Sequence, residues 1–267
     1  MKHMKLNKKA QFFNIILVII AAGILTTALF ILGPLTWKGD KLGEKQSNLI
    51  NKYQEAEKTL FYIDQSAILA AQQAVYDLAN NGGFYGKTNC NQYLGYNLWD
   101  NGSCYPDYNL NFKIYLTTYL NPYFEKITEE LKPKIVVHQN NHEISLIQKD
   151  KLNIIGTAIK PILITEPETD YTVNPSFNIE LDYNINDYQV INQDVLTLLE
   201  KCSDKEDAEL NNCIETNLPE NWSLGSCSIQ NRVYCFDATS SKQVLVYNKE
   251  TEKVEYTTIT YKFAIKF

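Results

Sequence analysis

The sequence predicts an α+β protein: an N-terminal transmembrane helix and a long amphipathic helix, packed on a head with an antiparallel sheet. Three observations predict it. An uncharged apolar run follows a basic N-terminus, an apolar repeat with helical spacing follows that run, and apolar and polar residues alternate through much of the C-terminal half. We divide the chain into five parts, residues 1–11, 12–33, 34–45, 46–83 and 84–267.

The first three parts form a predicted membrane anchor. Residues 1–11 are rich in lysine and contain no acidic residue. The run from Phe12 to Leu32 is uncharged and, as a helix, matches a hydrocarbon core of about 30 Å. We therefore expect residues 12–33 to span a cell membrane, with the leader in the cytoplasm and residues 34–267 outside it. Residues 34–45 are expected to form a juxtamembrane linker. A cleaved signal peptide is the alternative.

Residues 46–83 are predicted to form one long amphipathic helix that ends at Gly82-Gly83, because glycine closes helices readily. Its apolar positions recur every 3.5 residues on average, as in a coiled coil. These positions are Leu49, Tyr53, Ala56, Leu60, Ile63, Ala67, Ala70 and Ala74. Two interpretations stay open: the face covers the core of its own head, or it mediates self-association between subunits.

The head contains six cysteines, and no two have the C-x-x-C spacing typical of zinc sites. An even number of cysteines in polar loops favours disulfides and an oxidising compartment. We predict the local pairing, which closes short loops: Cys90–Cys104, Cys202–Cys213 and Cys227–Cys235. Asn101 and Asn221 each begin a glycosylation triplet, in keeping with an external location.

A loop at 82–108 is rich in aromatic residues, and two interpretations are open. Its rings are a candidate surface for a protein or glycan partner, or they cap the long helix and fill the core. The candidate contact residues are Phe84, Tyr85, Tyr93, Tyr96 and Trp99.

The rest of the head is predicted from the spacing of its apolar residues. Residues 109–131 have helical spacing, and Pro122 divides them. Short helices are expected at 195–201 and 206–216. Strands are expected at 134–138, 143–148, 152–158, 176–184, 231–237, 243–248 and 253–267.

Composition and motifs give little sign of chemistry. The net charge of −6 argues against a nucleic-acid partner. His138 and His142, followed by Glu143, have a metal-ligand spacing only if they lie on a helix, whereas Gln139-Asn140-Asn141 predicts a turn. We predict no metal, no cofactor and no enzymatic activity, with an extracytoplasmic enzyme of unrecognised class as an alternative.

The sequence Lys8-Lys9-Ala10-Gln11-Phe12-Phe13 resembles archaeal class III signal sequences, which direct type IV pilins and their relatives to a prepilin peptidase. The resemblance implies cleavage between Ala10 and Gln11, which would release an apolar helix that bundles into a filament. Many pilins carry Glu at the fifth mature position, where this chain has Ile15. The stretch from Tyr62 to Phe84 also resembles membrane-anchored proteins of small-genome archaea. The sequence thus favours an anchored surface protein with a structural or partner-contact role, and the alternative is a pilin-like subunit.

Overall fold

The computed structural model describes residues 8–86, 88–99, 104–131, 135–166, 169–227, 232–248 and 251–267. The side chains of 8–26, 28–42, 44–45, 165–166 and 169–170 lie outside this description. The chain divides into two units, Met1–Glu55 and Ala56–Phe267, and each is described by itself.

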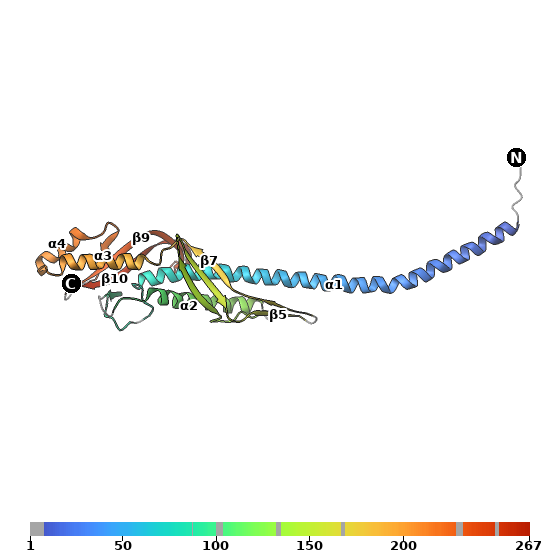
Figure 1. The fold of residues 1–267 in the computed structure, drawn as a ribbon, viewed down its shortest axis with the longest axis horizontal. Helices are drawn as coiled ribbons and strands as arrows, with labels where there is room; N and C mark the ends of the chain where they lie inside the picture. Colours follow the sequence, from blue (N-terminus) through green and yellow to red (C-terminus); the bar gives the residue numbers. More distant parts are fainter. Residues whose placement is uncertain are drawn as a thin grey trace, which may run out of the picture. The chain divides into compact units, whose positions relative to one another are not determined.

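Helix α1 extends from Lys8 to Asn80 (Figure 1). Its backbone is helical through residues 34–45, so the segment expected to be a separate linker is part of α1. The segment is helical although it contains Pro34, Gly39 and Gly43, which are poor helix formers. Among the residues whose side chains are described, no helix has an apolar stretch long enough to cross a membrane. The predicted span at 12–33 lies outside them, apart from Thr27.

The predicted apolar face changes from exposed to mostly buried at Ala56, the first residue of the second unit. From Ala56 onward its alanines and Ile63 are fully buried in the core of the second unit, and Leu60 is half-buried. In the first unit, Leu49 and Tyr53 are each 53% exposed. Burial in the core of the head is therefore confirmed for the second half of the face, and self-association stays a prediction.

The predicted end of α1 is confirmed. Gly82 and Gly83 have φ values of +59° and +82°. The Gly83 N–H donates to Leu78 O and the Gly82 N–H to Ala79 O, the pair of bonds that closes a helix in the Schellman motif.

Three side chains satisfy the carbonyl groups that follow α1. The side-chain amide of Asn97 donates to Asn81 O at 2.8 Å. Trp99 Nε1 donates to Gly82 O at 2.9 Å, and Asn111 Nδ2 donates to Gly83 O at 2.8 Å. Because buried carbonyl groups are costly when unpaired, these bonds fix the end of α1 to the segments that follow it.

The largest sheet has the order β1-β2-β10-β9-β8. Its strands are β1 (Gln92–Tyr93), β2 (Tyr96–Trp99), β8 (Trp222–Leu224), β9 (Val233–Asn248) and β10 (Lys253–Lys266). Strand β10 pairs antiparallel with β9 but parallel with β2. The expectation of a purely antiparallel sheet is therefore wrong. The parallel pair joins segments far apart in the sequence, and no local pattern marks it.

Two smaller sheets complete the strands. One has the order β3-β4-β7, from β3 (His142–Gln148), β4 (Leu152–Ala158) and β7 (Phe177–Leu181). The other is a hairpin of β5 (Ile162–Glu166) and β6 (Thr169–Val173), which the sequence did not predict. Residues 135–138 form no strand, so that prediction is wrong: Val137 N instead donates to the Thr128 hydroxyl.

The described part of the head contains three helices besides α1: α2 (Tyr108–Leu131), α3 (Asp187–Cys202) and α4 (Asp207–Asn217). Helix α2 runs beside the C-terminal part of α1 (Figure 1) and remains continuous through Pro122. Side chains of α1, α2, α3 and all three sheets share one apolar core. The head is thus an α+β domain.

Candidate functional site

A cavity of about 770 Å³ lies between α1, α2 and the β9–β10 pair. Five tyrosines line it, and we call it the tyrosine cavity: Tyr76, Tyr115, Tyr119, Tyr123 and Tyr247. Two carboxylates, Asp77 and Glu255, belong to the same lining. Its volume lies within the range of about 300–1,000 Å³ that is usual for small-molecule sites.

Regular spacing brings these residues together. Tyr115, Tyr119 and Tyr123 are four residues apart on α2 and therefore share one face of the helix. Gln73 and Asp77 have the same spacing on α1. The third wall is the β9–β10 ladder, in which Tyr247 pairs with Val254 and Val246 with Glu255.

Two glutamines of α1 hold the β9 wall in place. The Leu245 N–H donates to Gln72 Oε1 at 2.6 Å, and the Tyr247 N–H donates to Gln73 Oε1 at 3.1 Å. Among the described residues, β8 pairs with residues 236–238 of β9, and no strand pairs with residues 245–247 on that side. The glutamines supply the acceptors that a further strand would otherwise provide.

Asp77 is the centre of a hydrogen-bond network inside the cavity. Its Oδ2 accepts from Gln73 Nε2 at 3.0 Å and from the Tyr119 hydroxyl. Nearby, Asn81 Nδ2 donates to the Tyr115 hydroxyl at 2.8 Å. The rings of Tyr115 and Tyr119 are stacked, with centroids 6.1 Å apart. The polar atoms are therefore held in fixed positions.

Burial raises the pKa of two neighbouring phenols of the cavity, those of Tyr115 and Tyr119. Desolvation, with the charge of Asp77 as the next cause, raises the pKa of Tyr115 to about 12. Desolvation, followed by the hydrogen bond to Asp77, raises the pKa of Tyr119 strongly. The Tyr119 phenol therefore stays neutral at physiological pH and keeps donating its hydrogen bond to Asp77. The cavity therefore presents carboxylate oxygens and aromatic faces, which are features of a binding site.

No local sequence pattern identifies this cavity. Its residues come from four elements, and only their fold brings them together. The local signal that could have indicated it is the tyrosine at every fourth position from Tyr115 to Tyr123, within the segment predicted to be helical.

The aromatic residues of the 82–108 loop lie elsewhere, and most are buried. Phe84, Tyr96 and Trp99 are at most 8% exposed, so their proposed role as contact residues is wrong. The Trp99 ring stacks on Phe263 with centroids 4.4 Å apart. Burying these large apolar rings lowers the free energy of the fold more than leaving them in water. The alternative that they cap the helix and fill the core is confirmed for these three residues. Tyr93 is half-buried.

Two loop aromatics, Tyr85 and Tyr105, remain partly at the surface. Tyr85 is 39% exposed, and its ring meets Tyr115 edge-on at 4.7 Å between centroids. Its hydroxyl lies 3.2 Å from the Thr118 hydroxyl. Tyr85 therefore packs on α2 with one side and stays accessible on the other.

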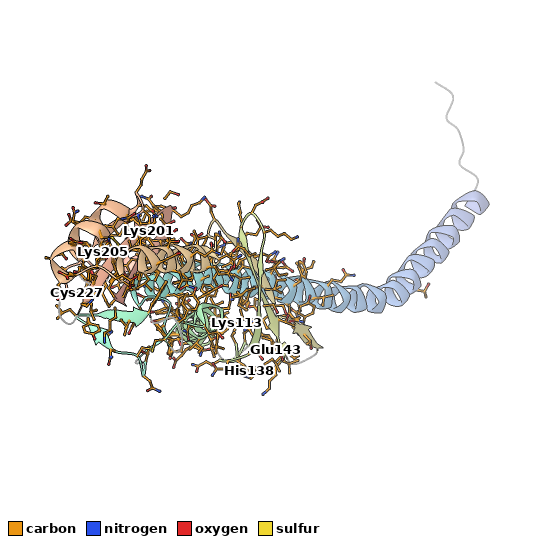
Figure 2. All side chains as sticks on the ribbon, turned by 60° about the vertical axis from the view of Figure 1, so that its left-hand side comes forward. Lys113, His138, Glu143, Lys201, Lys205 and Cys227 are labelled. Atoms are coloured by element: carbon orange, nitrogen blue, oxygen red, sulfur yellow. A yellow bond between two sulfur atoms is a disulfide. The ribbon has the colours of Figure 1, made fainter. Side chains whose placement is uncertain are left out.

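The two histidines of the head do not form a site together. His138 is exposed, and Figure 2 shows it and Glu143 far from Lys201 and Lys205. The His142 ring lies between Phe124 and Phe177, and its Nε2 is 2.9 Å from Pro175 O. Burial lowers the pKa of His142, which favours the neutral ring. In the part of the chain that the structure describes, no group of three or more acidic, histidine or cysteine side chains could hold a metal ion.

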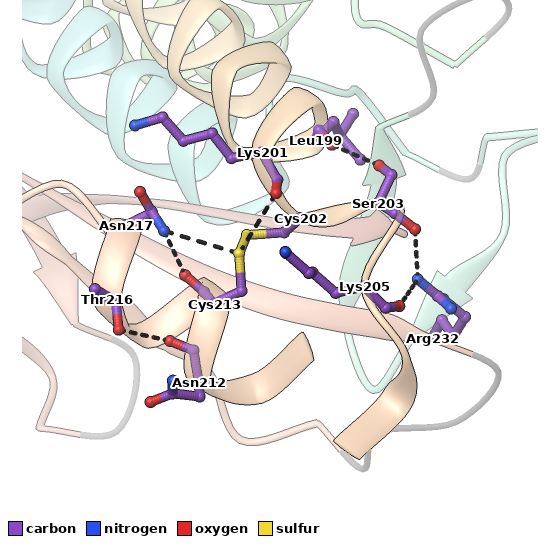
Figure 3. Close-up of a disulfide and its surroundings, with 10 residues drawn as sticks. All are labelled: Leu199, Lys201, Cys202, Ser203, Lys205, Asn212, Cys213, Thr216, Asn217 and Arg232. Atoms are coloured by element: carbon purple, nitrogen blue, oxygen red, sulfur yellow. Dashed lines mark hydrogen bonds between the residues drawn. A yellow bond between two sulfur atoms is a disulfide. The ribbon is translucent and has the colours of Figure 1, made fainter. Parts of the chain in front are cut away.

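All six cysteines form disulfides, and the predicted local pairing is confirmed. Cys202–Cys213 joins α3 to α4 (Figure 3). Next to it, Arg232 Nη2 donates to Ser203 O at 2.8 Å and to Lys205 O at 3.1 Å. Three disulfides are consistent with an extracytoplasmic head.

The remaining predicted sites are only partly described. The side chains of Ala10 and Gln11 and the whole of Asn101 lie outside the described residues. Asn221 is exposed just before β8, and its side-chain amide donates to Thr239 O at 3.0 Å. Its glycosylation stays a prediction.

Comparisons with models of protein families, with curated proteins and with solved structures found no match for this chain.

Proposed function

We propose that this chain is a single-pass membrane protein whose head lies outside the cytoplasm and has a structural or partner-contact role at the cell surface. The observation that carries this proposal is the set of three disulfides in one domain. Such bonds persist in oxidising compartments. The uncharged run from Phe12 to Leu32 and the lysines before it supply the anchor and its orientation.

The anchor can be tested on the full chain in isolated membranes. Wild-type protein should stay in the membrane fraction after washing at alkaline pH. The double variant Ile16→Asp/Ile20→Asp should be released, because a carboxylate at mid-span costs about 3 kcal/mol. Ser47→Asp/Asn51→Asp adds the same charge outside the run and should be retained. Release of the wild-type protein by the same wash would refute the anchor.

The location of the head can be tested through its cysteines. Protein taken from intact cells and alkylated without reductant should show no accessible thiol, since every cysteine is paired. A membrane-impermeant protease should remove the head from the outside of intact cells. Free thiols together with protection from the protease would place the head in the cytoplasm and refute the proposal.

A second candidate is a pilin-like subunit cleaved before Gln11. Two observations favour it. Helix α1 has no break between the predicted apolar segment and the head. In the first unit, Leu49, Ile50 and Tyr53 are each more than half exposed. Exposed apolar residues at helical spacing are typical of faces that pack against another helix.

Sequencing the N-terminus of the native protein separates the two candidates. A start at Gln11 supports the pilin-like subunit, and a start at Met1 refutes it. Assembly gives an independent measure. Leu49→Lys should abolish higher-order assembly on crosslinking, whereas the control Gln46→Lys should leave it intact. Equal crosslinking of both variants would count against packing through this face.

A further inference from the structure

The tyrosine cavity has a negative charge that its own lining does not balance. Two carboxylates, Asp77 and Glu255, line it, and no lysine, arginine or histidine does. Glu255 is exposed at the rim, whereas Asp77 is half-buried. A carboxylate withdrawn from water is normally paired with a cation. Among the described residues, Asp77 has no ion-pair partner.

The hydrogen bonds around Asp77 occupy only one of its two carboxylate oxygens. Gln73 Nε2 and the Tyr119 hydroxyl already donate to Asp77 Oδ2. A carboxylate offers about four lone-pair positions. No hydrogen bond to Oδ1 of Asp77 joins it to any other described residue. The network thus fixes the carboxylate and leaves acceptor capacity for a ligand that donates or carries positive charge.

The aromatic lining adds a second attraction for the same kind of ligand. Faces of tyrosine rings carry negative potential and attract cations. Tyr123 and Tyr247 are 37% and 51% exposed, which leaves their rings accessible at the mouth. Tyr119 lies beside the carboxylate. Aromatic rings next to an unbalanced carboxylate form the chemical pattern that recognises organic ammonium ions.

We propose that the tyrosine cavity binds a small organic ammonium ion, with Asp77 supplying the countercharge and the tyrosines supplying aromatic faces. This goes beyond the surface role proposed above and does not depend on the membrane anchor. Free amines and quaternary ammonium compounds share this chemistry.

The test titrates the full-length protein, purified in detergent, with three probes at constant ionic strength. Choline carries a quaternary ammonium, ethanolamine carries a primary ammonium, and dimethylbutanol is the uncharged analogue that has the shape of choline. Calorimetry should show a dissociation constant of about 1 mM or tighter for at least one cation. The uncharged analogue should bind about tenfold more weakly, because it lacks the charge. Preference for choline or ethanolamine identifies the class of amine.

Two variants and one control connect binding to the cavity. Asp77→Asn should weaken the binding of the preferred cation about tenfold while keeping the shape of the side chain. Tyr247→Ala, at the rim, should weaken it by a similar factor and removes little buried area, so it serves if Asp77→Asn fails to fold. Tyr256→Ala is the matched control: Tyr256 is 72% exposed on β10 and is not part of the lining. It should bind like the wild type.

Three results would overturn the proposal. One is that neither choline nor ethanolamine produces a measurable heat of binding. Another is equal affinity for choline and its uncharged analogue, which would indicate an apolar site only. The third is an effect of Tyr256→Ala as large as that of Tyr247→Ala, which would indicate non-specific binding to surface tyrosines.

Discussion

Gly156 allows β4 and β7 to pack closely, and its substitution should reveal how tightly the small sheet is packed. Gly156 pairs directly with Phe177, and the aromatic ring lies over the glycine. A Cβ at position 156 would lie 2.3 Å from both Cε1 and Cζ of Phe177. The ring has little room to move, because Phe177 is 3% exposed and its centroid is 5.1 Å from that of His142.

Gly156→Ala should therefore destabilise the head. Forcing one methyl group into a packed core costs about 1–3 kcal/mol. Replacing a glycine within a strand by alanine stabilises the fold by about 0.5–1 kcal/mol, because alanine loses less conformational entropy than glycine on folding. We expect a net loss of about 1–2 kcal/mol in the free energy of unfolding. Urea unfolding of the full chain, followed by tryptophan fluorescence, measures it.

A double-mutant cycle tests the cause. Phe177→Leu shortens the opposing side chain and should make room for the new methyl group. If the clash is responsible, Gly156→Ala should cost much less in the Phe177→Leu background, with a coupling energy of about 1 kcal/mol. Strict additivity of the two substitutions, or a Gly156→Ala variant as stable as the wild type, would refute the reasoning.

Three further predictions concern other contacts of the head. Arg232→Lys should lower the free energy of unfolding by about 1–2 kcal/mol, because a lysine cannot reach Ser203 O, Lys205 O and Phe267 O together; an unchanged urea midpoint would contradict this. Removing the Cys202–Cys213 disulfide with a Ser pair should cost about 3 kcal/mol, since it closes a loop with a sequence separation of 11; the thermal midpoint of the variant against wild type measures it, and equal midpoints would contradict the prediction. Burial in the folded state lowers the pKa of His142 below its ordinary value of 6.5. The stability that the buried neutral ring contributes is therefore full above pH 6.5 and is lost as the pH falls towards the pKa of the folded state. His142→Gln should therefore lose less stability than the wild type between pH 7 and pH 5, and equal slopes of unfolding free energy against pH would exclude this role.

Local patterns predicted those parts of the head that local forces determine. The end of α1 at Gly82-Gly83 and the helix at 109–131 follow from glycine conformation and apolar spacing. The three disulfides follow from short loops. In each case the interacting residues lie close together in the chain, so spacing alone carries the information.

Two strands predicted at 231–237 and 243–248 are in fact one strand, β9. The residues between them, 238–242, are mostly polar. They lie where the β9–β10 register shifts between Thr258 and Thr260. A bulge tolerates polar residues and bends a strand without ending it, so one strand continues through residues that separate two predicted ones.

The tyrosine cavity and the parallel pairing of β2 with β10 could not be predicted in this way. Residue Leu98 pairs with Ala264, and Asp77 meets Tyr119 only after α2 has folded against α1. Sequence spacing contains no information about such distant pairs. The aromatic loop shows the same limit: its composition is compatible with a contact surface, and burial of Trp99 is decided by where β10 lies.

The place of β10 in the sheet has a consequence for how the protein matures. Strand β10 lies at the centre of the five-stranded sheet, yet it follows every other strand in the chain. In the topology proposed above, β2 would leave the cytoplasm before β10, so the pairing of these two strands would be delayed, whereas the Cys90–Cys104 link needs only nearby residues. Oxidation of the local loops can therefore precede completion of the sheet. We expect a translocation intermediate with that disulfide formed and the edge of β2 still exposed to chaperones.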